Sequence, residues 1–414
     1  MLKQSVLYVF LQFLNILVGV YVTFYIAQNV DTQIFSILAI YTIINGIFMT
    51  FSFLGYETVL LRNALYWERI GCKKKIVNYV TYSLVSRLII GLVLIIPVVG
   101  YCYYLACVKF DNNYFFLLSS FSISGIFFSL ANSNALILKS FNKYILSFSI
   151  MAVSLIIGRL VSVYMFLNYG FFVFIIILVC IPVLIFFVSF RFISKYFSLK
   201  YIKFRYFLKF KNNKYFVFSG YLNYFKLSID QLLVSIFLSV EVLAVYNLAK
   251  KIEEIGKSLV EGFFDPMIQK LVTYKDDLNL TKVYKEKLYK IKNIFLVFIS
   301  ICVVVFNVFI DQLISVANLD HFQHLSYYLV FSSWTVILYT IYKVSSNIIY
   351  LFDNQKTLYK IDIFVGTLSI FFTILFFMDT TFKYIFLNRI FTGLVLCIFF
   401  HYFYKRFFIK KFCF

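Results

Sequence analysis

Charged residues are scarce in this sequence of 414 residues, because Asp, Glu, Lys and Arg together make up only 14% of it. Soluble globular domains carry roughly 25% charged residues. Hydrophobic residues amount to 62%, and the mean hydropathy is +0.89. These proportions exclude a soluble globular domain and indicate a polytopic membrane protein of the all-α class.

Patterns for metal ligands, disulfides and nucleotide binding are also lacking. The seven cysteines form no CxxC pair and no Cys/His spacing of the kind that holds zinc. Two of the three histidines, His321 and His324, lie in a short gap between apolar segments, where a solvated pair is the simpler interpretation. No ATP-binding motif is present. We therefore expect no metal, no disulfide framework and no cofactor.

Acidic residues are few, with 18 Asp and Glu against 39 Lys and Arg, so the net charge is +21. A nucleic-acid-binding protein would gather its basic residues on one solvated face. Here they alternate with long apolar segments instead. This pattern is the orientation signal of helical membrane proteins, and nucleic acid is not an expected partner.

Apolar segments long enough to cross the hydrocarbon core, which takes about 20 residues, recur along the whole chain. We expect twelve spans, near residues 6–27, 34–55, 79–107, 113–138, 145–167, 170–193, 214–239, 241–271, 291–315, 323–351, 356–378 and 381–404. With the N-terminus in the cytoplasm, 29 of the 39 basic residues fall in cytoplasmic segments and only Lys109 and Lys383 in outer ones. Both termini are therefore predicted to be cytoplasmic.

The eighth expected span, 241–271, is rich in charge and has an alternative interpretation as an amphipathic helix on the membrane surface. In that case the basic residues from Lys270 to Lys292 would lie outside the cell, and every later gap would reverse its charge bias. We therefore expect this segment to cross the membrane.

The basic segment 194–213 divides the chain into two sets of six spans. We expect an N-terminal six-helix lobe over 1–193, a cytoplasmic linker over 194–213 and a C-terminal six-helix lobe over 214–414. An offset of 210 residues aligns the halves at several positions, pairing Asp31, Leu38, Ala39, Gly46 and Phe53 with Glu241, Leu248, Ala249, Gly256 and Phe263. Because each half holds an even number of spans, the repeats are parallel, and such repeats place a transport site in a cavity at their interface.

Charges inside the expected spans are the candidate functional residues, since each costs ~2.5–3.5 kcal/mol at the centre of a helix that faces lipid. We assign eight basic and five acidic residues to the membrane interior rather than to the flanking segments, a balance of +3 that favours an anionic substrate. Arg159, Lys343 and Arg389 have no acidic neighbour at helical spacing and are the best candidates for binding a phosphate group. Lys226 is a further candidate, although Asp230 four residues later is able to neutralise it. Arg87 lies nearer a cytoplasmic end, from which its side chain can reach the interface.

One polar stripe runs along the eighth expected span at steps of three and four residues, through Asn247, Lys250, Glu254, Lys257, Glu261 and Asp265. Such a stripe either lines an aqueous cavity or is paired internally, Lys250 with Glu254 and Lys257 with Glu261, to hold neighbouring helices together. We favour cavity lining. Asp230, Glu254 and Glu261 are candidates for coupling transport to protons or sodium.

The gaps on the outer side are all shorter than about a dozen residues, too short for a domain that could hold an active site. This disfavours an enzyme such as a polysaccharide polymerase, which would need large outer loops. The chain is therefore expected to be a transporter rather than an enzyme.

Two segments resemble a known family. Residues 214–271, with Asp230 in the first helix, Tyr246, Ala249 and Lys250 after the turn and Pro266 near the end of the second, resemble the seventh and eighth spans of the Wzx-type O-antigen and polysaccharide repeat-unit flippases. In the first half, Leu54-Gly55-Tyr56-Glu57 followed by Leu61-Arg62 is similar to the segment after the family's second span. This family is a branch of the multidrug/oligosaccharidyl-lipid/polysaccharide exporter (MOP) superfamily.

The resemblance implies two six-helix lobes around a central cavity that carry an undecaprenyl-diphosphate-linked oligosaccharide, such as an O-antigen or capsule repeat unit, to the outer leaflet of the bacterial cytoplasmic (inner) membrane. The implied partners are the lipid-linked oligosaccharide and membrane lipids, with a polysaccharide polymerase and other assembly proteins as further candidates. The alternative is a multidrug exporter of the same superfamily. Its organic cations would need an acidic pocket, which the +3 balance disfavours.

Overall fold

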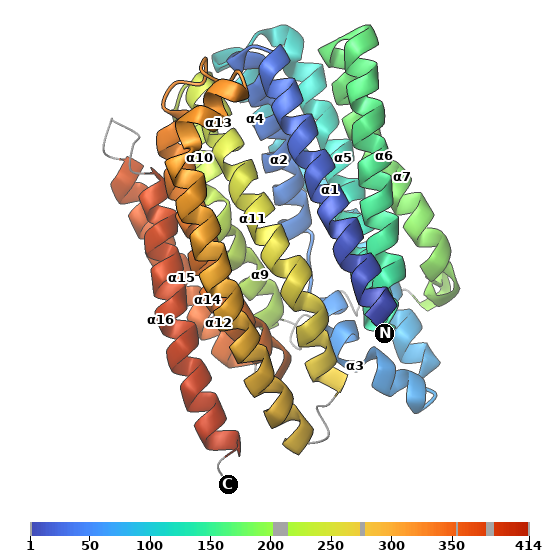
Figure 1. The fold of residues 1–414 in the computed structure, drawn as a ribbon. Coiled ribbons are helices and arrows are strands. Elements are labelled where there is room, and N and C mark those ends of the chain that lie inside the picture. The colour runs from blue at the N-terminus through green and yellow to red at the C-terminus, as the bar shows by residue number, and fades with distance from the viewer. Residues whose placement is uncertain (1, 202–213, 274–277, 353–354, 378–384, 413–414) are drawn as a thin grey trace. The chain divides into compact units, whose positions relative to one another are not determined.

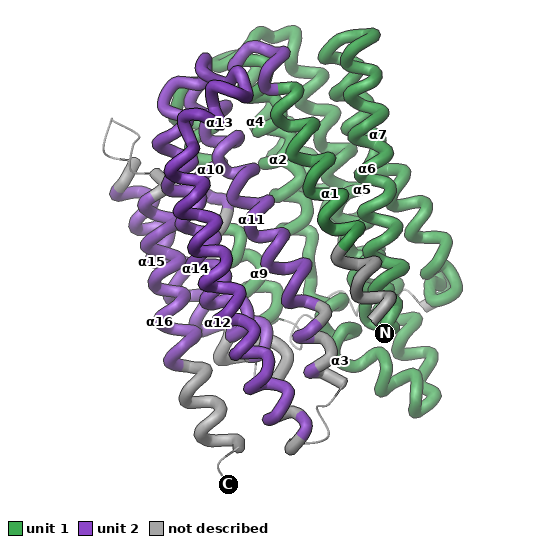
Figure 2. The backbone as a smooth tube through the Cα atoms, in the orientation of Figure 1, with its two compact units in different colours: residues 1–26, 33–224, 232–240 green, residues 27–32, 225–231, 241–414 purple. Residues whose placement is uncertain are grey.

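The computed structural model describes residues 2–201, 214–273, 278–352, 355–377 and 385–412, and every regular element in these ranges is a helix (Figure 1). The Cα positions form two compact units (Figure 2). Unit 1 holds residues 1–26, 33–224 and 232–240, and unit 2 holds residues 27–32, 225–231 and 241–414.

Unit 1 is built on a group of long helices around α5. Its helices are α1 (Leu2–Asn29), α2 (Thr32–Phe51), α3 (Tyr56–Arg69), α4 (Lys73–Val108), α5 (Phe115–Ser140), α6 (Tyr144–Tyr169), α7 (Phe171–Ile193), α9 (Lys214–Leu227) and most of α10 (Ile229–Phe237), with short 3-10 turns at Asn112–Tyr114, Ser194–Tyr196 and Leu199–Tyr201. Helix α5 packs against α3, α4, α6 and α7. Ala131 of α5 meets Ile181 and Ile185 of α7 in one core cluster, and a Cβ on Gly125 would lie 2.3 Å from Phe48 Cδ2, so only glycine permits this close approach of α5 to α2.

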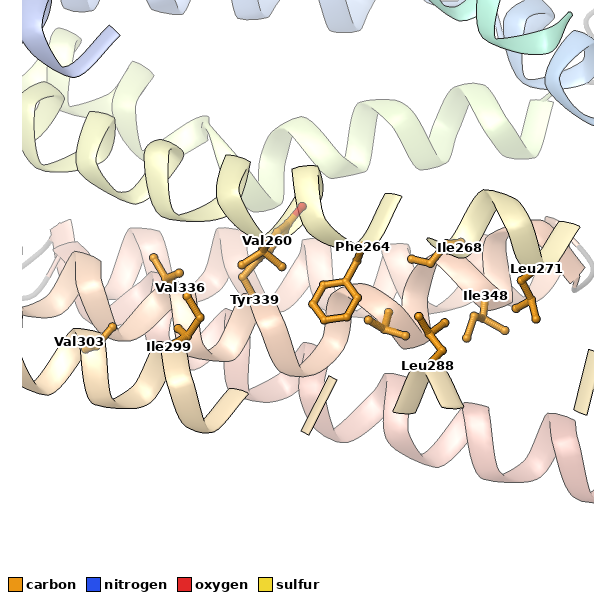
Figure 3. Packing of buried hydrophobic residues seen from close by; sticks show 11 residues of the cluster. Val260, Phe264, Ile268, Leu271, Leu288, Ile299, Val303, Val336, Tyr339 and Ile348 are labelled. Carbon is orange, nitrogen blue, oxygen red and sulfur yellow. The ribbon is translucent and has the colours of Figure 1, made fainter. Parts of the chain in front are cut away.

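Unit 2 contains α11 (Val240–Thr273), α12 (Leu278–Val308), α13 (Ile310–Val316), α14 (Leu325–Phe352), α15 (Gln355–Phe377) and α16 (Ile385–Phe412). Its core joins α11, α12 and α14 (Figure 3). Phe264 of α11 is fully buried there, beside Ile299 of α12 and Val336 of α14. Because one face of α11 packs into this core, the charged residues on its other side lie toward α10, α14 and α16.

Each of the twelve expected spans is helical over most of its described residues. Eight described helices are long and apolar enough to cross a membrane, and α11 falls outside that set because of its many charges. The seventh expected span, 214–239, consists of two helices, since α9 ends at Leu227 and α10 begins at Ile229. The basic segments before the third and before the ninth expected span are also largely helical where they are described, since α3 covers Tyr56–Arg69, α4 begins at Lys73 and α12 begins at Leu278.

Helix starts repeat along the chain. Helix α5 begins at residue 115 and α14 at residue 325, a difference of 325 − 115 = 210 residues, and α6 and α15 begin at residues 144 and 355, a difference of 211. This spacing agrees with the sequence offset of 210. The lobe boundary at 194–213 stays a prediction, because residues 202–213 lie outside the described residues.

Candidate functional site

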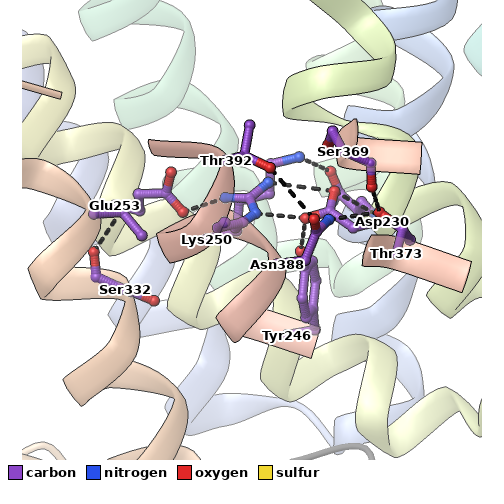
Figure 4. Close-up of polar contacts among 12 residues, drawn as sticks. Asp230, Tyr246, Lys250, Glu253, Ser332, Ser369, Thr373, Asn388 and Thr392 are labelled. Atoms are coloured by element: carbon purple, nitrogen blue, oxygen red, sulfur yellow. Dashed lines mark hydrogen bonds and ion pairs between the residues drawn. The ribbon is translucent and has the colours of Figure 1, made fainter. Parts of the chain in front are cut away.

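Among the described residues, a group of buried charges within unit 2 surrounds Arg389 of α16. Its side chain meets Asp230 of α10 and Glu253 of α11, and Lys250 and Lys257 of α11 complete what we call the Arg389 cluster. Figure 4 shows Asp230, Lys250 and Glu253 of this cluster. Four of these five residues are buried, and Lys257 is partly buried. With three basic and two acidic side chains, the cluster has a formal charge of 3 − 2 = +1.

Arg389 is held by both carboxylates. Its Nε lies 2.5 Å from Asp230 Oδ2, its Nη2 lies 3.4 Å from Asp230 Oδ1, and its Nη1 donates to Glu253 Oε2. The guanidinium also stands 5.8 Å from the ring centroid of Tyr246. The planar fork of arginine suits two carboxylates or one phosphate equally well, because both offer paired oxygen acceptors.

Asp230 is fixed by a short local network as well as by Arg389. Its Oδ1 accepts a hydrogen bond of 2.8 Å from the backbone N–H of Gln231, and its Oδ2 accepts one from Tyr246 OH. The Gln231 side chain in turn accepts from Lys250 Nζ at 2.7 Å and donates to Asn247 Oδ1 at 3.2 Å. Burial without such partners would be costly, so this network explains how the first turn of α10 holds a buried carboxylate.

A small cavity of about 20 Å³ adjoins the Arg389 cluster on the side of Glu253. Its lining includes Glu253, Lys257 and Arg389 together with the hydroxyl-bearing residues Thr335 and Thr392. This volume suffices for a water molecule, and the lining offers the polar partners that a buried water needs. Glu253, with 1% of its surface exposed, accepts from Arg389 through Oε2 and from Lys257 through Oε1.

A second group, the Lys343 cluster, consists of Glu261 of α11 with Tyr339 and Lys343 of α14. Lys343 Nζ lies 2.8 Å from Glu261 Oε1, which also accepts from Tyr339 OH. The ring of Tyr339 has Lys343 Nζ at 5.3 Å and Lys257 Nζ at 5.4 Å from its centroid. Tyr339 therefore connects the Lys343 cluster with the Arg389 cluster.

The remaining sequence candidates are placed differently. Arg159 belongs to unit 1, where its Nη1 donates to the backbone and side-chain oxygens of Asn15 at 3.0 Å each and passes so close to Gly19 that a Cβ there would lie 2.8 Å from it. Glu254 pairs with Lys251 at 2.8 Å and is partly exposed. The side chain of Lys226 lies outside the described residues.

The structure thus brings Arg389, Asp230, Asn247, Lys250 and Lys257 together in unit 2 and places Lys343 and Glu261 beside them. From the spacing we expected pairs of Lys250 with Glu254 and of Lys257 with Glu261. The structure shows ion pairs of Lys251 with Glu254 and of Lys257 with Glu253 on the same helix. Sequence reasoning missed Glu253, because it lies beside the polar stripe and its arginine partner is 136 residues away.

Unit 1 contains its own buried ion pair. Arg87 of α4 lies 2.5 Å from Glu57 of α3, with side chains only 2% and 1% exposed. Arg87 Nη1 also donates to Ser129 Oγ at 2.7 Å, to Met49 O at 3.1 Å and to Ser52 Oγ at 3.2 Å. The interpretation of Arg87 as a side chain that reaches the interface is therefore wrong, because its partner Glu57 is buried with it.

Long apolar helices with ion pairs buried between them make this a multi-pass membrane protein, and its fold is that of the MOP-superfamily transporters. No protein-family model and no curated protein sequence matches the chain. Among solved structures, the lipid II flippase MurJ in an inward closed conformation is similar with a TM-score of 0.73 and 16% identity, over 97% of this chain and 87% of the flippase.

Two further structures are transporters of the same superfamily rather than enzymes. A multidrug resistance MATE family transporter in an outward-facing conformation is similar with a TM-score of 0.71 and 13% identity, over 98% of this chain and 95% of that one. A MOP-superfamily transporter from Pyrococcus furiosus, whose binding pocket of reverse polarity suggests a different function, has a TM-score of 0.72 and 14% identity, over 99% and 96% of the two chains. At these identities the similarity concerns the fold.

Proposed function

We propose that this protein is a flippase that moves an undecaprenyl-diphosphate-linked oligosaccharide, such as an O-antigen or capsule repeat unit, from the inner to the outer leaflet of the bacterial cytoplasmic membrane. The observation that carries the proposal is the Arg389 cluster, in which a buried guanidinium, two lysines and two carboxylates inside helices have a net charge of +1. The resemblance of residues 214–271 to Wzx-type flippases and the fold similarity to a lipid II flippase support it.

In the proposed mechanism, Arg389, Lys343, Arg159 and Lys226 bind the diphosphate, because arginine and lysine are the side chains best suited to phosphate oxygens. Cavity lining or ion coupling is assigned to the polar residues of α10 and α11, namely Asp230, Asn247, Lys250, Glu254, Lys257 and Glu261. Movement of an anionic headgroup out of a cell with a negative interior is favoured by ~2.3 kcal/mol per charge per 100 mV. Alternating access of two lobes then needs no ATP.

The test compares surface glycan in cells that carry single Gln variants of Arg389, Lys343 and Arg159. We expect each variant to reduce export at normal protein levels, with Arg389→Gln the most severe because it removes the one guanidinium of the cluster. Lys73→Gln is the matched control, since it removes one positive charge from an exposed position at the start of α4 and should leave export unchanged. Unchanged surface glycan in Arg389→Gln would overturn the proposal.

A second candidate function is export of organic cations, which the two buried carboxylates at Arg389 and the fold similarity to MATE transporters support. Deletion of the gene separates the two. A flippase deletion leaves lipid-linked repeat units in the cytoplasmic leaflet, whereas a multidrug exporter deletion leaves glycan assembly intact and raises the intracellular level of cationic dyes.

A further inference from the structure

Arg389 presents a difficulty for any anionic ligand, because its donors already have partners. Asp230 occupies the Nε side at 2.5 Å and Glu253 accepts from Nη1. A phosphate needs the same donors in the same plane. If Arg389 binds the diphosphate as we propose, one of the two carboxylates must first give way.

The two carboxylates differ in how firmly they are held. Asp230 accepts hydrogen bonds from two donors besides Arg389, the backbone N–H of Gln231 and the hydroxyl of Tyr246, and both oppose its movement. Glu253 has Lys257 as its second partner, one turn further along the same helix. If Glu253 leaves Arg389, its charge remains paired with Lys257.

The cavity lies on the side of Glu253. Arg389, Lys257 and Glu253 all line it, with Thr335 and Thr392 as further polar lining, whereas Asp230 does not. Oxygen atoms of a ligand that enter this space meet Arg389 directly and compete with Glu253 for its guanidinium. Among the described residues, Lys250 and Tyr246 of α11 and Tyr342 of α14 also interact electrostatically with Glu253.

We propose that Glu253 is a specificity-determining residue that acts as an internal competitor for the guanidinium of Arg389. It weakens the binding of every anion at Arg389 by the same factor. The affinity for a phospholipid with one phosphate, such as phosphatidylglycerol, then becomes too low for this lipid to occupy the site at its concentration in the bilayer. A lipid diphosphate still binds, because it has more charge and more acceptor oxygens. Because anionic phospholipids greatly outnumber any lipid-linked glycan, such a threshold keeps the site available.

The experiment measures the dissociation constant of undecaprenyl diphosphate for the purified full-length protein in nanodiscs, either of phosphatidylcholine alone or with added phosphatidylglycerol. For the wild type we expect the same constant in both bilayers. For Glu253→Gln we expect binding about tenfold tighter in phosphatidylcholine, since a competing charge-assisted hydrogen bond is lost. Added phosphatidylglycerol should weaken binding by the variant, because it now occupies the site.

Glu57→Gln is the matched control, because Glu57 is equally buried and equally paired with an arginine, but in unit 1. Its dissociation constants should equal those of the wild type. If Glu253→Gln is not monodisperse, Glu253→Asp serves the same purpose, since the shorter side chain withdraws the carboxylate from Arg389 and should tighten binding to a smaller extent.

The outcomes separate this inference from the function on which it rests. In one outcome the wild type binds undecaprenyl diphosphate, Arg389→Gln does not bind it, and Glu253→Gln binds it no more tightly than the wild type. This outcome overturns the role of Glu253 as a competitor and leaves the flippase proposal intact. A wild type that does not bind undecaprenyl diphosphate, or an Arg389→Gln variant that binds it as well as the wild type does, overturns the proposed function itself.

Discussion

The buried pair of Arg87 and Glu57 illustrates why charges inside this protein are tolerated. Transfer of either charge alone into a low-dielectric interior would cost several kcal/mol, which the partner offsets only when it is present with good geometry. Arg87 has a carboxylate, two hydroxyls and a backbone carbonyl within hydrogen-bond distance. The stability of unit 1 should therefore depend on keeping both partners or neither.

This dependence gives a stability prediction. Arg87→Leu leaves Glu57 buried without its cation and should lower the free energy of unfolding by about 3–5 kcal/mol. The double variant Arg87→Leu with Glu57→Leu should recover most of that loss, because apolar residues of similar size often replace a buried pair at little cost. Denaturant unfolding of the purified protein in micelles measures both. A double variant as unstable as the single one would show that the pair is not coupled.

At the scale of residues, the sequence predicts which positions carry buried charge but not how they are paired. Arg389 is identified from the sequence because it interrupts an apolar helix. Its partner Glu253 is not, since helical spacing reveals only neighbours three or four residues away and this contact spans 136 residues. The same limit applies to Arg87 and Glu57, which are 30 residues apart on different helices.

At the scale of elements, the close contact of α11 with α14 depends on Gly256. A Cβ at that position would lie 2.6 Å from Val336 Cγ2, closer than side-chain atoms can approach. Helix α11 contributes Lys250, Glu253 and Lys257 to the Arg389 cluster and also part of the core of unit 2. Its distance from α14 therefore also sets the geometry of the Lys343 cluster.

Gly256→Ala should therefore destabilise the protein by about 1–3 kcal/mol through overpacking. Gly100→Ala in α4 is the control, since no atom lies within 4 Å of the added Cβ and alanine favours the helix over glycine. Adding Val336→Ala to Gly256→Ala should restore part of the loss by removing the opposing methyl groups. Comparison of the unfolding curves of these variants tests the contact, and equal destabilisation by Gly100→Ala would contradict it.

Apolar length and composition were sufficient to locate all twelve expected helices, because each must satisfy its backbone hydrogen bonds internally in the membrane. They did not locate the break between Leu227 and Ile229. No proline or glycine marks that position, and the side chain that follows it, Asp230, is fixed by contacts from α11 and α16. A helix break stabilised by distant residues leaves no local signal.

For the whole molecule, the predicted orientation in the membrane follows from the distribution of basic residues between the expected spans. The predicted cytoplasmic segments hold 29 of them, and the predicted outer segments hold two. The bias depends on α11 crossing the membrane. Between Lys73 and Asp320 lie seven expected spans, which places these exposed residues on opposite sides. If α11 lay on the surface instead, six spans would separate them and both would face the same side.

Single cysteines at these two positions, in a chain whose native cysteines are replaced by serine, test this arrangement. We expect a membrane-impermeant thiol reagent applied to intact cells to label Asp320→Cys and not Lys73→Cys, because the positive segment around Lys73 is held in the cytoplasm. In inverted vesicles the labelling should be reversed, which serves as the control for accessibility. Labelling of neither or both positions from the same side would mean that α11 does not cross, and labelling of Lys73→Cys alone from outside would invert the predicted topology.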